Sequence, residues 1–355
     1  MINYLRLLLL PFSLLYGLVT MIRNKLYDWK FYPSMKFDVP VICVGNLVVG
    51  GSGKTPVTEY LVGLLDNYKI AILSRGYGRS TKGFILADEK ANAELIGDEP
   101  MQYYKKFKQV SVAVCEDRVK GIRLLEQEHD LIILDDAFQH RKVTAGYNIL
   151  LFDYRKILSP QFLLPAGNLR EFFMGYKRAQ QILITKVSGK LDEKIKHKIR
   201  HRFSPSHSPC FSRIKYGTLQ PVYDQGPVTE KIIDQDTRVL LLTGIANPQP
   251  LHSYVKEMTP HIVHFDYPDH YSFTAEDIRK VILAFEKEKT VKKLILTTEK
   301  DAQRLSDIRI KELLLNLPVF YLPIKIDILA EDKATFDQNI IDYVSNHTRN
   351  RRLHK

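Results

Sequence analysis

Cysteine is scarce in this chain of 355 residues, where only Cys43, Cys115 and Cys210 occur. None of them forms a CxxC pair or has the Cys/His spacing of a zinc site. The odd count and the missing spacing argue against a disulfide framework and against structural zinc, and they indicate a reducing compartment.

Signatures of nucleic-acid binding are also absent. The chain has no RNP-like aromatic motif and no helix-turn-helix pattern. Acidic residues are outnumbered, 40 against 52 Lys and Arg, and the net charge of +12 favours an anionic partner such as a nucleotide, a phosphorylated substrate or an anionic membrane. We therefore expect no nucleic acid partner, and no obligate protein partner is evident.

One long apolar run occurs, at residues 5–22, with Arg6 as its only charge. The run is marginal for a transmembrane helix, which needs about 20 apolar residues, and Pro11 and Gly17 weaken it further. No small-x-small site follows, as a signal peptide would require, and burial in the protein's own core is a third alternative. We favour a membrane-anchoring helix that does not span the bilayer, at residues 1–25.

Basic residues follow the apolar run, at Arg23, Lys25 and Lys30. Such a flank suits a helix that lies in the membrane interface. It also keeps the body of the protein on the cytoplasmic side, where ATP is found. The sequence therefore predicts monotopic or peripheral attachment to a membrane surface.

The segment Val39–Thr58 predicts a phosphate-binding loop. It reads VPVICVGNLVVGGSGKTPVT, in which a β-branched strand is followed by a glycine-dense turn and by Lys54 and Thr55 at the start of a helix. This order is that of a P-loop. Glycine lets the backbone turn tightly with several N–H groups pointing at one spot, and the helix N-terminus adds positive potential.

The residues expected to bind ATP follow from this pattern. The Lys54 ammonium can reach the β- and γ-phosphates, and the Thr55 hydroxyl can bind Mg²⁺. The strict motif has glycine at position 48, where this chain has Val48, and a plain glycine-rich turn is the alternative. The predicted nucleotide-binding residues are Val48, Val49, Gly50, Gly51, Ser52, Gly53, Lys54 and Thr55.

Strand-like apolar runs alternate with amphipathic stretches along the chain, whose 45% hydrophobic and 26% charged residues are typical of a globular protein. Such alternation predicts an α/β fold: a P-loop NTPase-like, mostly parallel sheet with helices on both faces, and a smaller C-terminal α/β domain. The predicted strands are 41–44, 69–74, 110–115, 131–134, 148–152, 181–185, 238–243, 293–298 and 319–322. The predicted segments are the anchoring helix (1–25), a P-loop core (26–210), a linker (211–235), the smaller domain (236–345) and a basic tail (346–355).

Further chemistry-bearing residues follow the predicted strands, where α/β proteins bind ligands. Asp135 and Asp136 end one strand, at the place where a P-loop protein has a Mg²⁺-binding carboxylate, and the sequence leaves open which of the two binds the metal. Arginines suit phosphate recognition. The alternatives are that the arginines of SRGYGR are merely solvated, that Asp98 caps a helix and that His270 is structural. The other candidates are Arg75, Tyr77 and Arg79 in SRGYGR, Asp98 and Glu99 in GDEP, Arg118 in CEDR, Gln139 and His140 in DDAFQHR, Arg170 in LLPAGNLRE, and His270 in YPDHYSF.

These motifs, in one order with GNLVVGGSGKTP and TTEKD, resemble the tetraacyldisaccharide 4′-kinase family, the lipid A 4′-kinases of Gram-negative bacteria. The resemblance spans nearly the whole chain. It implies a P-loop kinase on the cytoplasmic face of the inner membrane. That kinase transfers the γ-phosphate of ATP to the 4′-hydroxyl of a tetraacyl glucosamine disaccharide 1-phosphate.

The resemblance also implies roles for individual residues. Asp98 looks like the catalytic base and His270 like the histidine that orients it. Lys54, Arg170 and Mg²⁺ would neutralise charge on the transferring group. The remaining candidates that look like site residues are Glu99, Arg118 and His140. The two-domain pattern implies closure over the nucleotide, with the region around residue 300 contacting it.

Two other functions are compatible with the motifs. A membrane-associated P-loop NTPase would release free phosphate without a lipid, and Lys186 in ITKV faintly echoes the guanine-reading N-K-x-D motif but lacks its Asn and Asp. A nucleotide-sensing scaffold would bind ATP without turnover, but it leaves the paired acids and His270 without a purpose. A requirement for an acceptor separates the kinase from both.

Overall fold

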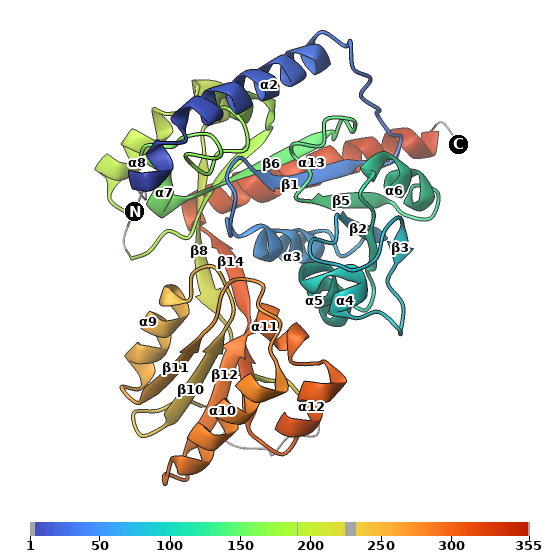
Figure 1. Cartoon of the computed structure of the whole chain (residues 1–355). Coiled ribbons are helices and arrows are strands. Elements are labelled where there is room, and N and C mark those ends of the chain that lie inside the picture. The colour runs from blue at the N-terminus through green and yellow to red at the C-terminus, as the bar shows by residue number, and fades with distance from the viewer. Residues whose placement is uncertain (1–3, 190, 224–231, 354–355) are drawn as a thin grey trace.

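The computed structural model describes residues 4–189, 191–223 and 232–353, which are built around two β-sheets (Figure 1). The strands of the larger sheet are β1 (Val41–Asn46), β2 (Ile70–Ser74), β3 (Ile85–Leu86), β4 (Ser111–Val114), β5 (Leu131–Asp135), β6 (Tyr147–Asp153), β7 (Gln181–Thr185), β8 (Cys210–Tyr216) and β14 (Ile324–Ile328). They lie in the order β14-β8-β7-β6-β1-β5-β2-β4-β3. Neighbours from β8 to β4 are parallel, and the edge strands β14 and β3 are antiparallel.

Helices cover both faces of this sheet, as the sequence predicts. One face carries α3 (Lys54–Leu64), α5 (Asp98–Lys106) and α13 (Ala330–Leu353), and the other carries α6 (Arg118–Leu125) and α8 (Glu193–Arg200). Alternate residues of β1 enter the two cores, so the strand is buried on both sides, as its continuous apolar run indicates. The remaining helices of this part are α1 (Tyr4–Leu7), α2 (Leu10–Asp28), α4 (Ala93–Ile96), α7 (Tyr154–Ile157), η1 (Phe173–Arg178) and η2 (Pro205–His207).

The smaller sheet comes from the C-terminal third of the chain. Its strands are β9 (Gln220–Pro221), β10 (Arg238–Thr243), β11 (Ile262–Asp266), β12 (Lys293–Thr298) and β13 (Val319–Leu322), in the order β11-β10-β12-β13-β9. All pairings are parallel except that of β9. Its helices are α9 (Gln249–Met258), α10 (Ala275–Lys287), α11 (Glu299–Arg304) and α12 (Ile308–Leu314).

The chain returns to the larger sheet after the smaller one, which the predicted boundaries miss. Strand β8 occupies the start of the predicted linker (211–235) and pairs with β7. Strand β14 and helix α13 come from the predicted smaller domain but complete the larger sheet and its core. The chain returns because apolar side chains of β14 and α13 are buried there: Ile326 is 6% exposed and Phe336 is 0% exposed.

The predicted basic tail (346–355) is mostly helical, because α13 continues to Leu353. Thr348 is buried, so the start of this tail packs against the protein. Residues 354–355 of the tail and 224–231 of the predicted linker lie outside the described residues.

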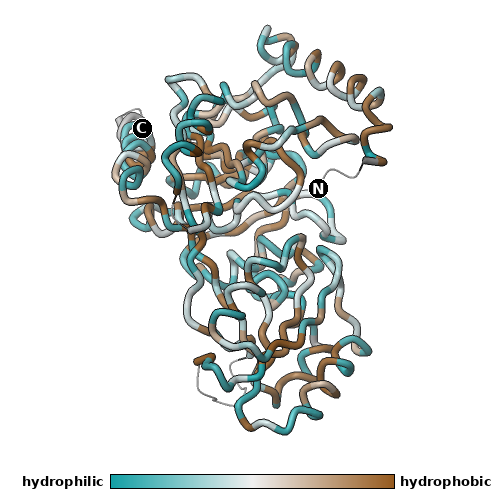
Figure 2. The backbone as a smooth tube through the Cα atoms, turned by 90° about the vertical axis from the view of Figure 1, so that its left-hand side faces the viewer, coloured by the Kyte–Doolittle hydropathy of each residue, from teal (hydrophilic) through white to brown (hydrophobic). Residues whose placement is uncertain are grey.

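Helix α2 lies along the outside of the larger sheet and runs three residues past the predicted end at residue 25 (Figure 1). Only its Ser13 and Gly17 are buried, whereas Phe12 is 62% and Leu14 74% exposed. Apolar residues along this peripheral helix are visible in Figure 2. The alternative that this run is buried in the protein's own core is therefore wrong. No helix in the described ranges is long and apolar enough to cross a membrane.

Two connections place the smaller sheet against the larger one. Strands β8 and β14 pair as an antiparallel ribbon between the sheets (Figure 1). In addition, α5 of the larger unit packs against α11 of the smaller one. Lys106 of α5 forms ion pairs at 2.7 Å with Glu59 of α3 and with Glu299 of α11. This α5–α11 contact brings residues from both units to one site.

Candidate active site

The phosphate-binding loop has the predicted form, between the end of β1 and the start of α3. Gly50 and Gly53 have φ angles of 106° and 87°, in the left-handed region that favours glycine. Val48, which departs from the strict motif, forms an isolated β-bridge with Leu169. The valine therefore ties the loop to the neighbouring segment at 163–171.

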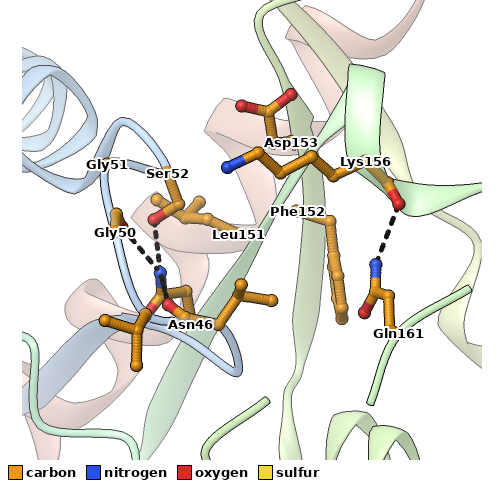
Figure 3. Close-up of a pocket in the computed structure, with 11 residues that line it drawn as sticks. Asn46, Gly50, Gly51, Ser52, Leu151, Phe152, Asp153, Lys156 and Gln161 are labelled. Carbon is orange, nitrogen blue, oxygen red and sulfur yellow. Dashed lines mark hydrogen bonds between the residues drawn. The ribbon is translucent and has the colours of Figure 1, made fainter. Parts of the chain in front are cut away.

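The side chain of Asn46, which is not among the predicted site residues, holds this loop from inside. Its amide donates to the Val48 carbonyl at 2.7 Å and to Ser52 Oγ at 2.8 Å. Figure 3 shows these bonds and the pocket beside the loop, with the loop on one wall and Asp153 and Gln161 on the other.

Strand β7 supports the loop from outside. Thr185 Oγ1 donates to the Ser52 carbonyl at 2.8 Å. Lys186 donates to the Gly51 carbonyl and forms an ion pair with Asp153 at 3.0 Å. The lysine that faintly echoes a guanine-reading motif therefore braces the loop.

Asp136 lies between the two predicted phosphate-binding cations. Arg170 donates to both of its carboxylate oxygens, at 2.8 and 3.2 Å, and Lys54 Nζ is 3.5 Å from Oδ2. Burial raises the pKa of Asp136, but the positive charges of Lys54 and Arg170 outweigh burial and lower it. Asp136 is thus an ionised link between the two cations. Its φ of 52° is unusual for a residue other than glycine and is common at functional sites.

Asp135 is buried, and one of its oxygens is unsatisfied. The Tyr103 hydroxyl donates to Oδ2 at 3.1 Å, whereas Oδ1 has no hydrogen-bond partner among the described residues. Burial raises the pKa of Asp135 to about 7. An orphaned, buried carboxylate oxygen costs free energy unless a ligand satisfies it, so the free Oδ1 of Asp135 fits a divalent cation. Within the described part of the chain, His, Cys, Asp and Glu do not gather in groups of three or more that could hold a metal.

Asp98 and His270 meet across the two units, although 172 positions separate them in the sequence. Asp98 is the first residue of α5, and His270 lies in the loop that follows β11. His270 Nδ1 is 3.3 Å from Asp98 Oδ2. Asp98 makes no side-chain cap of its helix, so the alternative that it is simply a capping residue is wrong.

Arg304 of α11 also binds Asp98, although it is not among the predicted site residues. Its Nη2 and Nε donate to Asp98 Oδ2 at 2.6 and 3.0 Å. Burial raises the pKa of Asp98, but the hydrogen bonds from His270 and Arg304 outweigh burial and lower the pKa to about 2. The only signal in the sequence was the position of Arg304, one helical turn after Lys300 in TTEKD.

Lys300 determines which nitrogen of His270 carries the proton. Lys300 Nζ is 3.1 Å from His270 Nε2 and 3.0 Å from Glu99. An ammonium group can only donate, so Nε2 accepts and Nδ1 carries the hydrogen that is donated to Asp98. The predicted site residue Glu99 therefore holds the lysine that orients the histidine.

The predicted site residues Arg118, Gln139 and His140 are buried or partly buried. Arg118 is 3% exposed, and burial together with this arginine lowers the pKa of His140 to about 4. Gln139 Nε2 donates to the Asn46 carbonyl at 2.9 Å, and its Oε1 is 3.4 Å from Arg170 Nη1. Gln139 therefore connects the phosphate-binding loop to Arg170.

The SRGYGR motif divides into one buried and two exposed side chains. The Arg79 guanidinium forms an ion pair with Glu116 at 2.5 Å and donates to the Gly83 carbonyl at 2.7 Å, so Arg79 braces its own loop. Arg75 and Tyr77 are exposed. The ring of Tyr77 lies 5.4 Å from that of His270, centroid to centroid, which places this motif beside the Asp98–His270 pair.

The apolar N-terminal helix also contacts the site, which the sequence did not indicate. Tyr16 donates to the Arg170 carbonyl at 2.7 Å, and Asn24 donates to Glu171 at 2.9 Å. Glu171 is 3% exposed and also accepts from Gln139 at 3.1 Å. The inner face of α2 therefore supports the segment that carries Arg170.

Comparison with known proteins gives one consistent result. A family model described as tetraacyldisaccharide-1-P 4′-kinase matches residues 5–345. The chain is 44% identical to a tetraacyldisaccharide 4′-kinase of Bacteroides thetaiotaomicron, with 96% of this chain and 94% of the relative covered. It is 43% identical to one of Flavobacterium psychrophilum, with 98% and 99% covered. It also resembles the crystal structure of LpxK from Aquifex aeolicus in complex with ATP, with a TM-score of 0.75, 32% identity, and 96% and 99% covered.

Proposed function

This chain belongs to the tetraacyldisaccharide-1-P 4′-kinase family, and we propose that it catalyses phosphoryl transfer with Asp98 as the base. It is an ATP-dependent kinase of lipid A biosynthesis. It transfers the γ-phosphate of ATP to the 4′-hydroxyl of a tetraacyl glucosamine disaccharide 1-phosphate. One observation supports the role of Asp98: His270 and Arg304 hold its carboxylate in place through Oδ2.

In the proposed reaction every bond that forms or breaks, and the proton, is accounted for by ATP, the lipid and Asp98. The 4′-hydroxyl oxygen forms a bond to the γ-phosphorus, the bond from that phosphorus to the β–γ bridging oxygen breaks, and the hydroxyl proton passes to Asp98. Because the phosphoryl transition state is loose, catalysis depends mainly on positioning and charge stabilisation. Lys54 and Arg170 supply positive charge to the transferring group, and Asp136 holds these two cations in place.

Label transfer tests the activity itself. Detergent-solubilised protein is mixed with γ-labelled ATP, Mg²⁺ and tetraacyl disaccharide 1-phosphate, and the label is followed by chromatography. We expect label in the lipid. Label found only in free phosphate, at the same rate without lipid, would instead support the NTPase alternative.

Mg²⁺ is the metal that fits the site, with Thr55 and Asp135 as the residues that would hold it. The unsatisfied Oδ1 of Asp135 supports this assignment, whereas both oxygens of Asp136 already face cations. When bound, Mg²⁺ supplies positive charge to the β- and γ-phosphates, and it usually keeps several waters besides one or two protein ligands.

Chelation by EDTA is expected to abolish turnover, and added MgCl₂ to restore it. Asp135→Asn weakens a ligand, so it should raise the Mg²⁺ concentration for half-maximal activity by at least about tenfold, the lower end for losses around metal sites. A Mg²⁺ titration of the labelled-transfer assay measures this, with the exposed Asp66→Asn as the charge-matched control. An unchanged titration for Asp135→Asn would remove Asp135 from the metal site.

We further propose peripheral attachment to the cytoplasmic face of the inner membrane through α1 and α2. The support is the exposed apolar surface on these helices and on the turn between them, where Leu8 of the turn is 75% and Leu15 of α2 is 61% exposed. A contiguous apolar patch on a protein surface is typical of a membrane or partner contact, and the lipid substrate favours the membrane. The surface would also hold the site at the plane where a lipid headgroup lies.

Membrane recovery tests this attachment. Deletion of residues 1–22 should reduce sedimentation with membranes, but it also removes Tyr16, which supports Arg170. The triple change Leu8→Ser, Phe12→Ser and Leu15→Ser is therefore the sharper variant, and it should lower membrane recovery while turnover of detergent-dispersed lipid stays within about threefold. Leu283→Ser, at a 56% exposed position on α10, is the control. Unchanged sedimentation of the triple variant would place the attachment elsewhere.

A further inference from the structure

Helix α11 presents two cations to the Asp98–His270 pair. Lys300 and Arg304 are four residues apart, so they lie on the same face of the helix. Lys300 contacts His270 Nε2, and Arg304 contacts Asp98 Oδ2. The proposed base comes from the larger unit, whereas every side chain that donates to it in the described residues comes from the smaller one.

We propose that Arg304 is a positioning residue for the reaction: it clamps Asp98 Oδ2 and leaves Oδ1 as the oxygen that accepts the proton. This inference rests on the proposed role of Asp98 as the base. Three donor atoms converge on Oδ2, from His270 Nδ1, Arg304 Nε and Arg304 Nη2. No hydrogen bond from the described residues reaches Oδ1, so this oxygen keeps its lone pairs.

The arginine is itself fixed by a buried network. Its Nη1 donates to the Gly244 carbonyl at 2.9 Å and to Asp301 Oδ1 at 2.7 Å. Asp301 is 0% exposed, and its Oδ2 accepts from the Gly244 amide at 3.0 Å and from Thr298 Oγ1 at 2.7 Å. The Arg304 side chain is 8% exposed. A planar guanidinium held at three corners can position a carboxylate more closely than a mobile surface lysine can.

Charged groups from three elements contact Asp98 or the cations and histidine around it, and together they set its proton affinity. The loop after β11 supplies His270 and Asp269, and α11 supplies Lys300, Asp301 and Arg304, while Glu99 is the neighbour on α5 and is paired with Lys300. Burial opposes ionisation of Asp98, and the two arginine N–H bonds favour it. Replacing the guanidinium with a neutral side chain therefore raises the pKa of Asp98 and protonates the base at a higher pH.

The test is the dependence of kcat on pH between 5 and 8, with saturating ATP and detergent-dispersed lipid. In the wild-type enzyme Asp98 stays ionised over this window because its pKa is about 2. Arg304→Met should lower kcat at pH 8 by about 10²-fold through misplacement of the base. It should also bring an acid limb into the window. Arg304→Lys restores a positive charge without the planar fork, so it should remove the acid limb but recover only part of kcat.

Two further variants make the result decisive. Arg309→Met, at an exposed arginine paired with Asp307, is the matched control and should keep the wild-type profile. Asp98→Asn in the same assay separates this inference from the proposed function. If Asp98→Asn is inactive and Arg304→Met has the wild-type profile, the positioning role is wrong and the base role stands. If Asp98→Asn turns over like the wild type, both are wrong.

Folding of each variant is checked by its thermal unfolding midpoint. If Arg304→Met does not fold, Arg304→Gln replaces it, because glutamine keeps a polar side chain without the charge. A purely structural arginine would lower the unfolding midpoint and kcat without changing the shape of the pH profile, and that result would overturn the proposal.

Discussion

Asp98→Asn is expected to lower kcat by about 10²–10⁴-fold, the usual scale for loss of a general base. Asparagine keeps the shape of the side chain but cannot accept the hydroxyl proton. The KM for ATP should change little, because we expect the glycine loop and Lys54, rather than Asp98, to bind the phosphates. Steady-state label transfer at varied ATP measures both constants.

The matched control for this change is Asp66→Asn, which also removes one carboxylate but at an exposed position after α3. It should retain wild-type turnover. Near-normal kcat for Asp98→Asn would remove Asp98 from the role of base, and the proton would then have to leave by another route. His270→Gln should give a smaller loss than Asp98→Asn, because it removes only one of the three donors to Oδ2.

Lys54→Met has the second largest expected effect. The ammonium is expected to contact the β- and γ-phosphates, and it also lies 3.5 Å from Asp136. Loss of one preorganised cation at the transferring group should lower kcat by about 10²–10³-fold. Methionine retains most of the aliphatic length, so the change tests the charge rather than the packing.

Lys69→Met serves as the control for Lys54→Met, because Lys69 is an exposed lysine immediately before β2 and lies outside the phosphate-binding loop. ATP affinity measured by titration separates a binding defect from a catalytic one. Retained turnover in Lys54→Met would mean that this loop does not hold the transferring phosphate, and the P-loop interpretation would be wrong.

The local parts of the site were predictable from the sequence. The strand, the glycine turn and Lys54–Thr55 lie within 20 consecutive positions, so their arrangement follows from backbone chemistry that neighbouring residues control. The buried strands were equally visible, because a strand covered on both faces is a continuous apolar run.

The pairing of Asp98 with His270 was available only through the family resemblance, since nothing in the spacing of two residues 172 positions apart predicts contact. The residues that support Arg170 from α2 and from its own segment were not indicated by any motif. Glu171 and Asn24 read as ordinary polar residues until the structure placed them against each other at 2.9 Å. The run at 5–22 indicated a membrane helix, but not that its inner face supports Arg170.

The sequence by itself determined the P-loop, the acidic strand end and, through its motifs, the kinase family, whose resemblance in turn proposes Asp98 as the base. Only the tertiary structure decided which side chains support that chemistry. Arg304 reaches Asp98 across 206 positions because α5 and α11 pack together. Strand β14 and α13 return to the larger sheet because their apolar faces are buried there. Contacts of this kind depend on how whole elements pack, and local sequence patterns do not encode packing between distant elements.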